Sequence, residues 1–323
     1  MTEHRIDFHC HFLPDFYRQA LVDAGHEKPD GIKALPKWSE ESAIDMMNKV
    51  NIQHTCLSIS SPGVHFGDDA KAQLLSRQVN EEAARLAKNH PGRFSFFASL
   101  PLPDNEAAKQ ELIYAMDKLG AIGMVMGSNL DGRYAGDNSL FPIYHELNQR
   151  GGILFVHPTT PNCHCGSNVS SQGNSFLYPA PVMEYMFETT RTITHLIHAG
   201  ILDKFPDIKI LVPHAGAALC LLSSRIDLAV PMLSSDDALP LIKPALKKLY
   251  FDLAGIPVPD MLPILLNNAD LKKIVYGSDY PFTPLPTVLE LAKLLDSAQY
   301  PHPTSLHQIM TSNATQLLGS ILK

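Results

Sequence analysis

The sequence predicts a single-domain (β/α)8 barrel of the TIM type over residues 1–323, and three observations support this fold class. Short apolar runs that suit strands alternate with amphipathic helical segments along the chain. Eight such runs occur, and several are apolar throughout, as expected for parallel strands buried on both faces. Metal-ligand side chains follow several runs at their carboxyl ends, where a barrel assembles its site. An open doubly wound sheet alternates similarly, so these side chains favour the closed barrel.

The expected elements follow in chain order. Strands are predicted at residues 5–10, 55–59, 94–99, 123–127, 153–157, 209–213, 249–253 and 273–277. Helices are predicted at residues 40–50, 70–89, 105–119, 142–150, 182–203, 217–228, 259–268 and 287–296, with Pro or Gly at most junctions. Two long connections, residues 14–37 and 159–181, follow the first and fifth strands. Because both leave carboxyl ends of strands, we expect them to shape the substrate site.

Composition and charge narrow the functional classes. A chain with 45% hydrophobic and 18% charged residues is typical of a globular protein, and its net charge of −7 gives no reason to expect nucleic acid as a partner. No apolar N-terminal segment and no uninterrupted apolar stretch of about 18 residues occurs, so neither export nor membrane spanning is expected. The odd count of 5 cysteines suits reduced thiols, which predicts a cytoplasmic location.

The first strand ends in Asp7-Phe8-His9-Cys10-His11. In extended backbone, residues two apart point to the same face, so His9 and His11 could bind one ion. Taken alone, such a pair is a weak motif, because two histidines that hydrogen-bond each other at a loop fit the pattern equally well. Whether these two histidines bind a metal ion therefore depends on which residues lie at the ends of the other strands.

Three further strands end in residues of the same type. His157 ends the fifth strand, His214 follows the sixth, and Asp279 follows the eighth. Since the carboxyl ends of barrel strands converge on one face, these side chains and the first-strand histidines are expected to surround a common centre. Five isolated residues of this kind would not fall there by chance.

This residue set predicts a metal centre. Imidazole nitrogens with one carboxylate suit zinc, with another first-row ion such as manganese as the alternative, and leave positions open for water and substrate. The fourth strand, residues 123–127, offers no Lys or Glu that could bridge a second ion. We therefore expect one divalent ion and no organic cofactor.

Further motifs extend along nearly the whole chain. They are Asn-His-Pro-Gly-Arg-Phe at 89–94, Glu-Thr-Thr-Arg at 188–191, Phe-Pro-Asp at 205–207 and Asn-Ala-x-x-Leu-Leu-Gly at 313–319. With the five site residues, the sequence resembles the amidohydrolase superfamily, in its aminocarboxymuconate-semialdehyde decarboxylase branch, also called amidohydrolase-related family 2. Within this branch, residues 37–38, 60–63 and 157–159 are most similar to 6-methylsalicylate decarboxylase-like members.

The resemblance assigns roles to individual residues. It implies that His9, His11, His157 and Asp279 bind the ion, and that His214 and Asp279 are catalytic. Arg225 lies eleven residues after His214, at the spacing of an arginine that binds the substrate carboxylate across a dimer interface in some relatives. The alternative is a surface arginine that pairs with Asp227 or with solvent. The resemblance also implies a homodimer.

The resemblance further implies the reaction. It favours a metal-dependent carboxy-lyase that decarboxylates a small aromatic or unsaturated carboxylic acid, such as a hydroxybenzoate, without oxidation. The ion would hold the substrate as a Lewis acid, and His214 or Asp279 would supply the proton to the ring carbon. The alternative is metal-dependent hydrolysis of a lactone, ester or amide by the same residues. A non-catalytic metal-binding protein is the third hypothesis.

Other candidate residues receive structural interpretations. Cys163-His164-Cys165 does not match zinc spacings and is assigned to a loop. Trp38 could line the pocket or act as a packing anchor. Arg191 is expected to form an ion pair within its helix, and His195 with His198 to lie on one helix face.

Overall fold

The computed structural model describes residues 4–162, 177–233 and 239–319, and within them eight parallel strands form a ring. Hydrogen bonding orders these strands as β1-β2-β3 and as β10-β9-β8-β7-β4. The strands are β1 (Arg5–His11), β2 (Ile52–Ser58), β3 (Phe94–Phe96), β4 (Gly123–Gly127), β7 (Ile153–His157), β8 (Lys209–Val212), β9 (Tyr250–Asp252) and β10 (Ile274–Val275).

Two seams close the ring. Beyond the end of β3, Ala98 pairs with Met124 of β4, and the Ala98 amide donates to the Gly123 carbonyl at 2.9 Å. On the other side, Asp7 of β1 pairs with Tyr276, and the Phe8 amide donates to the Tyr276 carbonyl at 2.9 Å. The eight strands therefore form a closed barrel, and the predicted (β/α)8 fold is confirmed.

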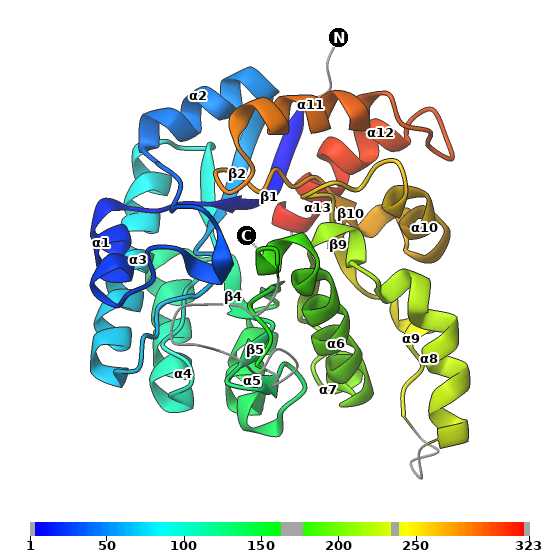
Figure 1. The fold of residues 1–323 in the computed structure, drawn as a ribbon, viewed down its shortest axis with the longest axis horizontal. Coiled ribbons are helices and arrows are strands. Elements are labelled where there is room, and N and C mark those ends of the chain that lie inside the picture. The colour runs from blue at the N-terminus through cyan, green and yellow to red at the C-terminus, as the bar shows by residue number, and fades with distance from the viewer. Residues whose placement is uncertain (1–3, 163–176, 234–238, 320–323) are drawn as a thin grey trace.

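Helices surround the barrel (Figure 1). Side-chain caps mark where several helices begin: Ser39 and Ser42 form a capping box across the start of α2, and Asp68 and Asp104 accept hydrogen bonds from backbone amides at the starts of α3 and α4. The helices are α1 (Asp15–Asp23), α2 (Glu40–Val50), α3 (Asp69–Asn89), α4 (Asn105–Tyr114), α5 (Phe141–Gln149), α6 (Glu184–His198), α7 (Ile201–Lys204), α8 (Leu219–Leu233), α9 (Ile242–Ala245), α10 (Met261–Asn268), α11 (Leu285–Asp296), α12 (Ser305–His307) and α13 (Asn313–Gly319).

The buried apolar side chains form two clusters. The larger one fills the space between strands and helices, whereas the smaller one fills the barrel interior with residues such as Phe8, Phe97 and Phe155. Helix α13 belongs to the interior cluster through Ala314, Leu317 and Leu318. The Asn313 side chain, at the start of α13, donates to the carbonyl of Ile274 at the start of β10. Helix α13 thus closes the amino end of the barrel, and the carboxyl ends remain for the site.

Several elements differ from the sequence prediction. The helix predicted over 182–203 is broken, because Gly200 has a φ of 72° that a glycine adopts without a Cβ clash, so α6 ends at His198 and α7 begins at Ile201. The connection predicted over 14–37 contains α1. An unpredicted hairpin, β5 (Asn129–Leu130) with β6 (Arg133–Tyr134), follows β4. The Cys163-His164-Cys165 motif lies outside the described residues.

Candidate metal centre

Four predicted ligands meet at the carboxyl ends of the strands. One ligand atom from each of His9, His11, His157 and Asp279 lies within 4.8 Å of all the others. The two first-strand Nε2 atoms are 3.1 Å apart, and Asp279 Oδ1 lies 3.5 Å from His9 Nε2 and 3.3 Å from His11 Nε2. The histidines are buried and the Asp279 side chain is 19% exposed. The structure therefore brings the predicted ligand set together.

Hydrogen bonds fix which nitrogen of each histidine carries its proton. The Asp252 carboxylate and the Pro158 carbonyl can only accept, so Nδ1 of His9 (2.9 Å) and Nδ1 of His157 (2.8 Å) are the protonated atoms. Ser58 Oγ donates to the Cys10 carbonyl at 3.3 Å and therefore accepts from His11 Nδ1 at 2.9 Å. All three Nε2 lone pairs consequently face the centre, as metal-binding histidines require.

The spacing of these atoms fits a divalent ion. Metal–ligand bonds of about 2.0–2.2 Å place neighbouring ligands roughly 3–3.5 Å apart and opposite ligands about 4.2 Å apart. The measured 3.1, 3.3 and 3.5 Å separations lie in the first range, and the 4.8 Å limit lies close to the second. Three neutral imidazoles with one carboxylate suit a first-row transition metal better than calcium or magnesium.

Burial and charge set the ionisation of the ligands. Burial lowers the pKa of His11, and burial with neighbouring histidines lowers that of His157 strongly, so both are neutral. Burial opposes ionisation of Asp279, but the neighbouring imidazoles of His11 and His9 outweigh it and lower the pKa of this carboxyl group. Burial also opposes charge on His9, whose pKa is nevertheless raised by the Asp252 carboxylate.

Asp252 is a functional residue that the sequence prediction missed. Its Oδ2 accepts from His9, and its Oδ1 accepts from the backbone amides of His214 (2.9 Å) and Ala254 (3.0 Å). The side chain is fully buried. Asp252 thus positions a metal ligand and the predicted catalytic histidine together. A carboxylate that ends the apolar seventh strand could have indicated this role, since a buried charge needs partners.

His214 lies beside the ligands without joining the four-residue cluster. Its ring centroid is 5.0 Å from that of His9. Burial, with the nearby imidazole of His9, lowers the pKa of His214 to about 4, so the His214 imidazole is neutral at pH 7. Within the described residues, its buried Nδ1 has no hydrogen-bond partner. A neutral imidazole with an unsatisfied nitrogen is suited to hold or pass a proton.

An unusual turn holds His214 in place. His214, Ala215 and Ala217 have φ values of 55°, 53° and 52°, in the region that non-glycine residues avoid. Two contacts fix the ends of the turn: Asp252 accepts from the His214 amide, and Thr190 Oγ1 accepts from the Ala218 amide at 3.1 Å. The surrounding structure therefore imposes the position of this imidazole.

A cavity of about 910 Å³, hereafter the mouth cavity, opens above the cluster and is lined by His214 and Asp279. Residues of the 14–37 connection also line it, as expected. Asp30 ties this connection to the β7 loop, because it accepts from the Thr160 hydroxyl and from the Thr160 amide. Tyr185 lines the same cavity and is buried, which raises the pKa of its phenol, and it hydrogen-bonds Asp30.

Arg225 does not line the cavities described in this chain. It is exposed on α8 and has no ion pair within the described residues. Asp227 instead accepts from the backbone amides of Ile242 (2.6 Å) and Lys243 (3.0 Å), so the predicted alternative pairing with Asp227 is not observed.

The remaining candidates have structural contacts. Arg191 forms the expected ion pair with the buried Glu188, which also accepts from Asn129 at 2.8 Å. The Trp38 ring packs edge-on against Phe12, with centroids 5.9 Å apart, as a packing anchor does. His195 and His198 contact the backbone of Gly136 and Pro240, respectively.

Comparison with known sequences agrees with this geometry. The profile of the amidohydrolase family Amidohydro_2 matches residues 6–320. The chain is 33% identical to decarboxylase yanB of Aspergillus niger over 90% of this chain and 81% of the relative. It is also 33% identical to the 6-methylsalicylic acid decarboxylase of Penicillium expansum, over 97% of this chain and 95% of the relative.

Solved structures share the fold. A crystal structure described as an amidohydrolase II superposes with a TM-score of 0.89 and 31% identity, covering 98% of this chain and 99% of the other. The dihydroxybenzoic acid decarboxylase of Polaromonas sp., solved with bound manganese and 2-nitroresorcinol, superposes with a TM-score of 0.83 and 20% identity, covering 98% and 97%. The barrel, its converging side chains and the near full-length profile match together establish that this chain belongs to the amidohydrolase family.

Proposed function

We propose that this chain is a metal-dependent carboxy-lyase that removes carbon dioxide from a small hydroxybenzoate-type acid without an organic cofactor. One observation supports this most strongly. Three imidazole Nε2 atoms and one carboxylate oxygen converge below a large cavity, next to a neutral histidine that is not part of the four-residue cluster. The decarboxylase names of relatives at 33% identity agree with this function.

Different residues of the site have different roles in the proposed reaction. His9, His11, His157 and Asp279 would hold the ion, which acts as a Lewis acid toward the carboxylate or a neighbouring hydroxyl of the substrate. Cleavage of the carbon–carbon bond releases carbon dioxide and leaves an electron pair on the ring carbon, which must then accept a proton. His214 is suited to carry this proton because it lines the cavity and its Nδ1 is unsatisfied within the described residues. Asp279, which also lines the cavity, is the alternative proton carrier.

The identity of the ion belongs to this proposal. The nitrogen-rich ligand set favours zinc. Manganese is the alternative, and it is the ion bound in the Polaromonas decarboxylase. Elemental analysis of protein purified without added metal distinguishes the two.

We also propose that a second copy of the chain covers α8. Leu221, Arg225, Leu228 and Met232 are spaced so that they share one face of this helix, and all are exposed. These apolar side chains surround Arg225, which has no ion pair within the described part of the chain. Such a surface fits a dimer interface, from which Arg225 would reach the substrate of the partner. By length and composition alone, the segment His214–Leu233 could also cross a membrane, which is weak evidence because core helices pass the same test.

We also propose that the protein is located in the cytoplasm. Cys10, Cys56 and Cys220 are free and buried, as in proteins of a reducing compartment.

The test supplies zinc or manganese to the purified chain and offers it 6-methylsalicylate and, separately, simple lactones and esters. We expect carbon dioxide and the decarboxylated phenol from the first substrate. New acid products without carbon dioxide would instead indicate the hydrolase alternative. A variant with both His9→Ala and His11→Ala should lose bound metal and turnover, while Leu294→Ala, on the outer surface of α11, serves as the control.

A further inference from the structure

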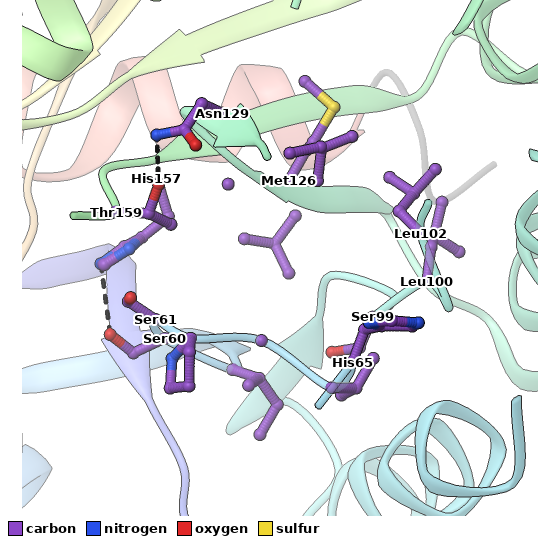
Figure 2. A pocket seen from close by; sticks show the side chains of 17 residues that line it. Ser60, Ser61, His65, Ser99, Leu100, Leu102, Met126, Asn129, His157 and Thr159 are labelled. Atoms are coloured by element: carbon purple, nitrogen blue, oxygen red, sulfur yellow. Dashed lines mark hydrogen bonds between the residues drawn. The ribbon is translucent and has the colours of Figure 1, made fainter. Parts of the chain in front are cut away.

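A second, smaller cavity lies beside the metal centre (Figure 2). Its volume is about 90 Å³, and the ends of β2, β3 and β4 with the β5 strand of the hairpin surround it. We call it the β2–β4 pocket. Apolar side chains form much of its wall, and its polar lining consists of Ser60, Ser61, His65, Ser99, Asn129, His157 and Thr159. The hydrogen bonds of these polar groups determine what the pocket can hold.

Several polar groups of the lining already have partners. The Asn129 amide group donates to Glu188 at 2.8 Å and to Thr159 Oγ1 at 3.1 Å. His65 Nε2 lies 2.8 Å from a carboxylate oxygen of the exposed Asp69, outside the pocket. These side chains shape the wall of the β2–β4 pocket, but their hydrogen bonds are directed to other residues of the chain.

Two hydroxyl groups can serve an occupant. Ser99 Oγ is buried and has no hydrogen-bond partner within the described residues. Ser60 Oγ lies 3.5 Å from His157 Nε2, and when that nitrogen binds the ion, its lone pair no longer accepts from Ser60. Figure 2 shows Ser60 next to His157, and Ser99 farther along the pocket. The β2–β4 pocket thus offers two hydrogen-bond donors to a small acceptor.

The lining carries no charge that would hold an ion. Among the described residues, no Lys, Arg, Asp or Glu borders the pocket. Burial lowers the pKa of His157 strongly, so this imidazole is neutral. A bicarbonate or carboxylate ion in the pocket would lose its hydration without gaining a charged partner, which is strongly unfavourable. The occupant is therefore an uncharged molecule.

The volume admits only a small molecule. A cavity of about 150 Å³ holds benzene, which has six non-hydrogen atoms, so a molecule with three such atoms needs roughly half of that volume. Carbon dioxide is uncharged, has three such atoms, and each of its oxygens can accept a hydrogen bond. The 90 Å³ of the β2–β4 pocket is sufficient for it. About three water molecules, at about 30 Å³ each, also fit and would occupy the pocket before the reaction.

The β2–β4 pocket and the proposed proton carrier lie on opposite sides of the barrel. Strands β2 and β8 are four positions apart in the closed ring of eight, and His214 follows β8. Ser60 and Ser61 follow β2 and line both the pocket and the mouth cavity. Carbon dioxide can therefore leave the metal centre toward one side while the proton arrives from the other.

We propose that the β2–β4 pocket receives the carbon dioxide that the proposed decarboxylation releases, and the inference rests on that function. The bond between the ring carbon and the carboxyl carbon breaks, its electron pair stays on the ring carbon, and carbon dioxide leaves as a neutral molecule. Carbon dioxide that moves into the pocket is no longer in contact with the ring carbon, so the electron pair takes the proton instead of forming the same bond again. The pocket consequently affects kcat and leaves KM unchanged.

The first experiment tests whether dissolved carbon dioxide occupies the pocket. Turnover of 6-methylsalicylate by the metal-loaded protein is followed by absorbance at constant pH, with carbon dioxide or bicarbonate added at the start. Carbon dioxide should lower kcat at unchanged KM, because an occupied pocket cannot receive the product. Bicarbonate should inhibit only as it is converted to carbon dioxide, and added carbonic anhydrase should shorten this delay.

Two variants change the pocket. Leu130→Phe, on the half-buried hairpin, should fill it, so that kcat falls and added carbon dioxide has no further effect. Ser99→Ala removes one donor and should raise the inhibition constant of carbon dioxide about 2- to 13-fold, which corresponds to a hydrogen bond of about 0.5–1.5 kcal/mol. Leu294→Phe and Ser297→Ala make the same substitutions at exposed positions in and after α11, and both should behave as the parent chain does.

Crystals of the metal-loaded protein under carbon dioxide pressure provide a readout that does not depend on turnover. Electron density for carbon dioxide should appear in the β2–β4 pocket of the parent chain and should be absent from Leu130→Phe. A pocket that keeps only water under pressure would contradict the proposal.

The outcomes separate this proposal from the proposed function. If 6-methylsalicylate is decarboxylated but carbon dioxide does not lower kcat, or lowers it equally in Leu130→Phe, the pocket assignment is wrong and decarboxylation stands. Density in the crystals would then show binding at high pressure only. If no acid releases carbon dioxide, the decarboxylation proposal fails, and the assigned role of the pocket fails with it.

Discussion

Replacing Asp252 with Asn tests whether this carboxylate sets the proton position on His9. The carboxylate accepts three hydrogen bonds, one from His9 Nδ1 and two from the backbone amides of His214 and Ala254. Asparagine keeps the shape but replaces one oxygen with a donor. If its NH2 group faces His9, then Nδ1 must accept and the proton moves to Nε2, where it blocks the ion. If the amide is turned over, its NH2 group faces two backbone amides, which are also donors.

Either orientation therefore weakens metal binding. Loss of such an outer partner typically costs 10- to 100-fold in metal affinity, or about 1.4–2.7 kcal/mol. We expect a loss in this range for Asp252→Asn. Turnover should fall further even at saturating metal, because the His214 amide is held by the same side chain.

The assay is a competition titration of metal against a chromophoric chelator, with circular dichroism as the check on folding. Asp203→Asn removes the same charge on the exposed helix α7, where Asp203 pairs only with Lys248 among the described residues, and it should bind metal as the parent chain does. An unchanged metal affinity in Asp252→Asn, with the fold intact, would show that Asp252 does not fix the His9 tautomer.

Further predictions concern pH, metal removal and assembly. The pKa of His214 is about 4 in the folded chain against 6.5 for the free side chain, so the unfolded chain binds this proton first and stability falls as the pH drops. Urea unfolding of the metal-free protein measures this effect as a change in the free energy of unfolding. Between pH 7.5 and pH 5, that free energy should fall by about 2 kcal/mol more in the parent chain than in His214→Asn, and equal falls would contradict the assigned pKa. Chelation should lower the thermal midpoint, because an ion present at 100 times its dissociation constant stabilises the fold by about 2.7 kcal/mol; no shift in calorimetry would argue against a resident ion. Leu228→Glu should convert the proposed dimer to a monomer in sedimentation experiments, whereas Leu74→Glu, exposed on α3, should not; co-sedimentation of the parent chain with lipid vesicles would favour a membrane role for α8 instead.

The fold class and the convergence of the site residues could be predicted from the sequence, because both follow from local patterns of strands and helices. Alternating strand and helix patterns imply parallel strands, and a barrel brings their carboxyl ends together, so His9, His157 and Asp279 could be placed near one another without coordinates. The positions of the helix ends depend on the backbone angles of single residues, which the pattern does not show. A glycine inside an amphipathic pattern does not reveal whether it takes a positive φ, and Gly200 does, which divides the predicted helix.

Contacts between distant residues could not be predicted in the same way. Asp252 and His9 are 243 residues apart, and their hydrogen bond exists only once the barrel has closed. The small hairpin β5–β6 was missed because strands of two residues carry no periodicity. A cavity of about 90 Å³, to which this hairpin contributes Leu130, could likewise not be found by pattern analysis.

The turn at residues 214–217 sets a limit for protein engineering. Non-glycine residues in left-handed backbone cost about 1–2 kcal/mol each, so a glycine at position 215 would relieve local strain. A search for heat-resistant variants would therefore tend to select Ala215→Gly. The same change would let the chain sample other backbone angles beside His214, and the imidazole would spend less time at its present position next to His9. Thermal tolerance and turnover should consequently diverge at this one position.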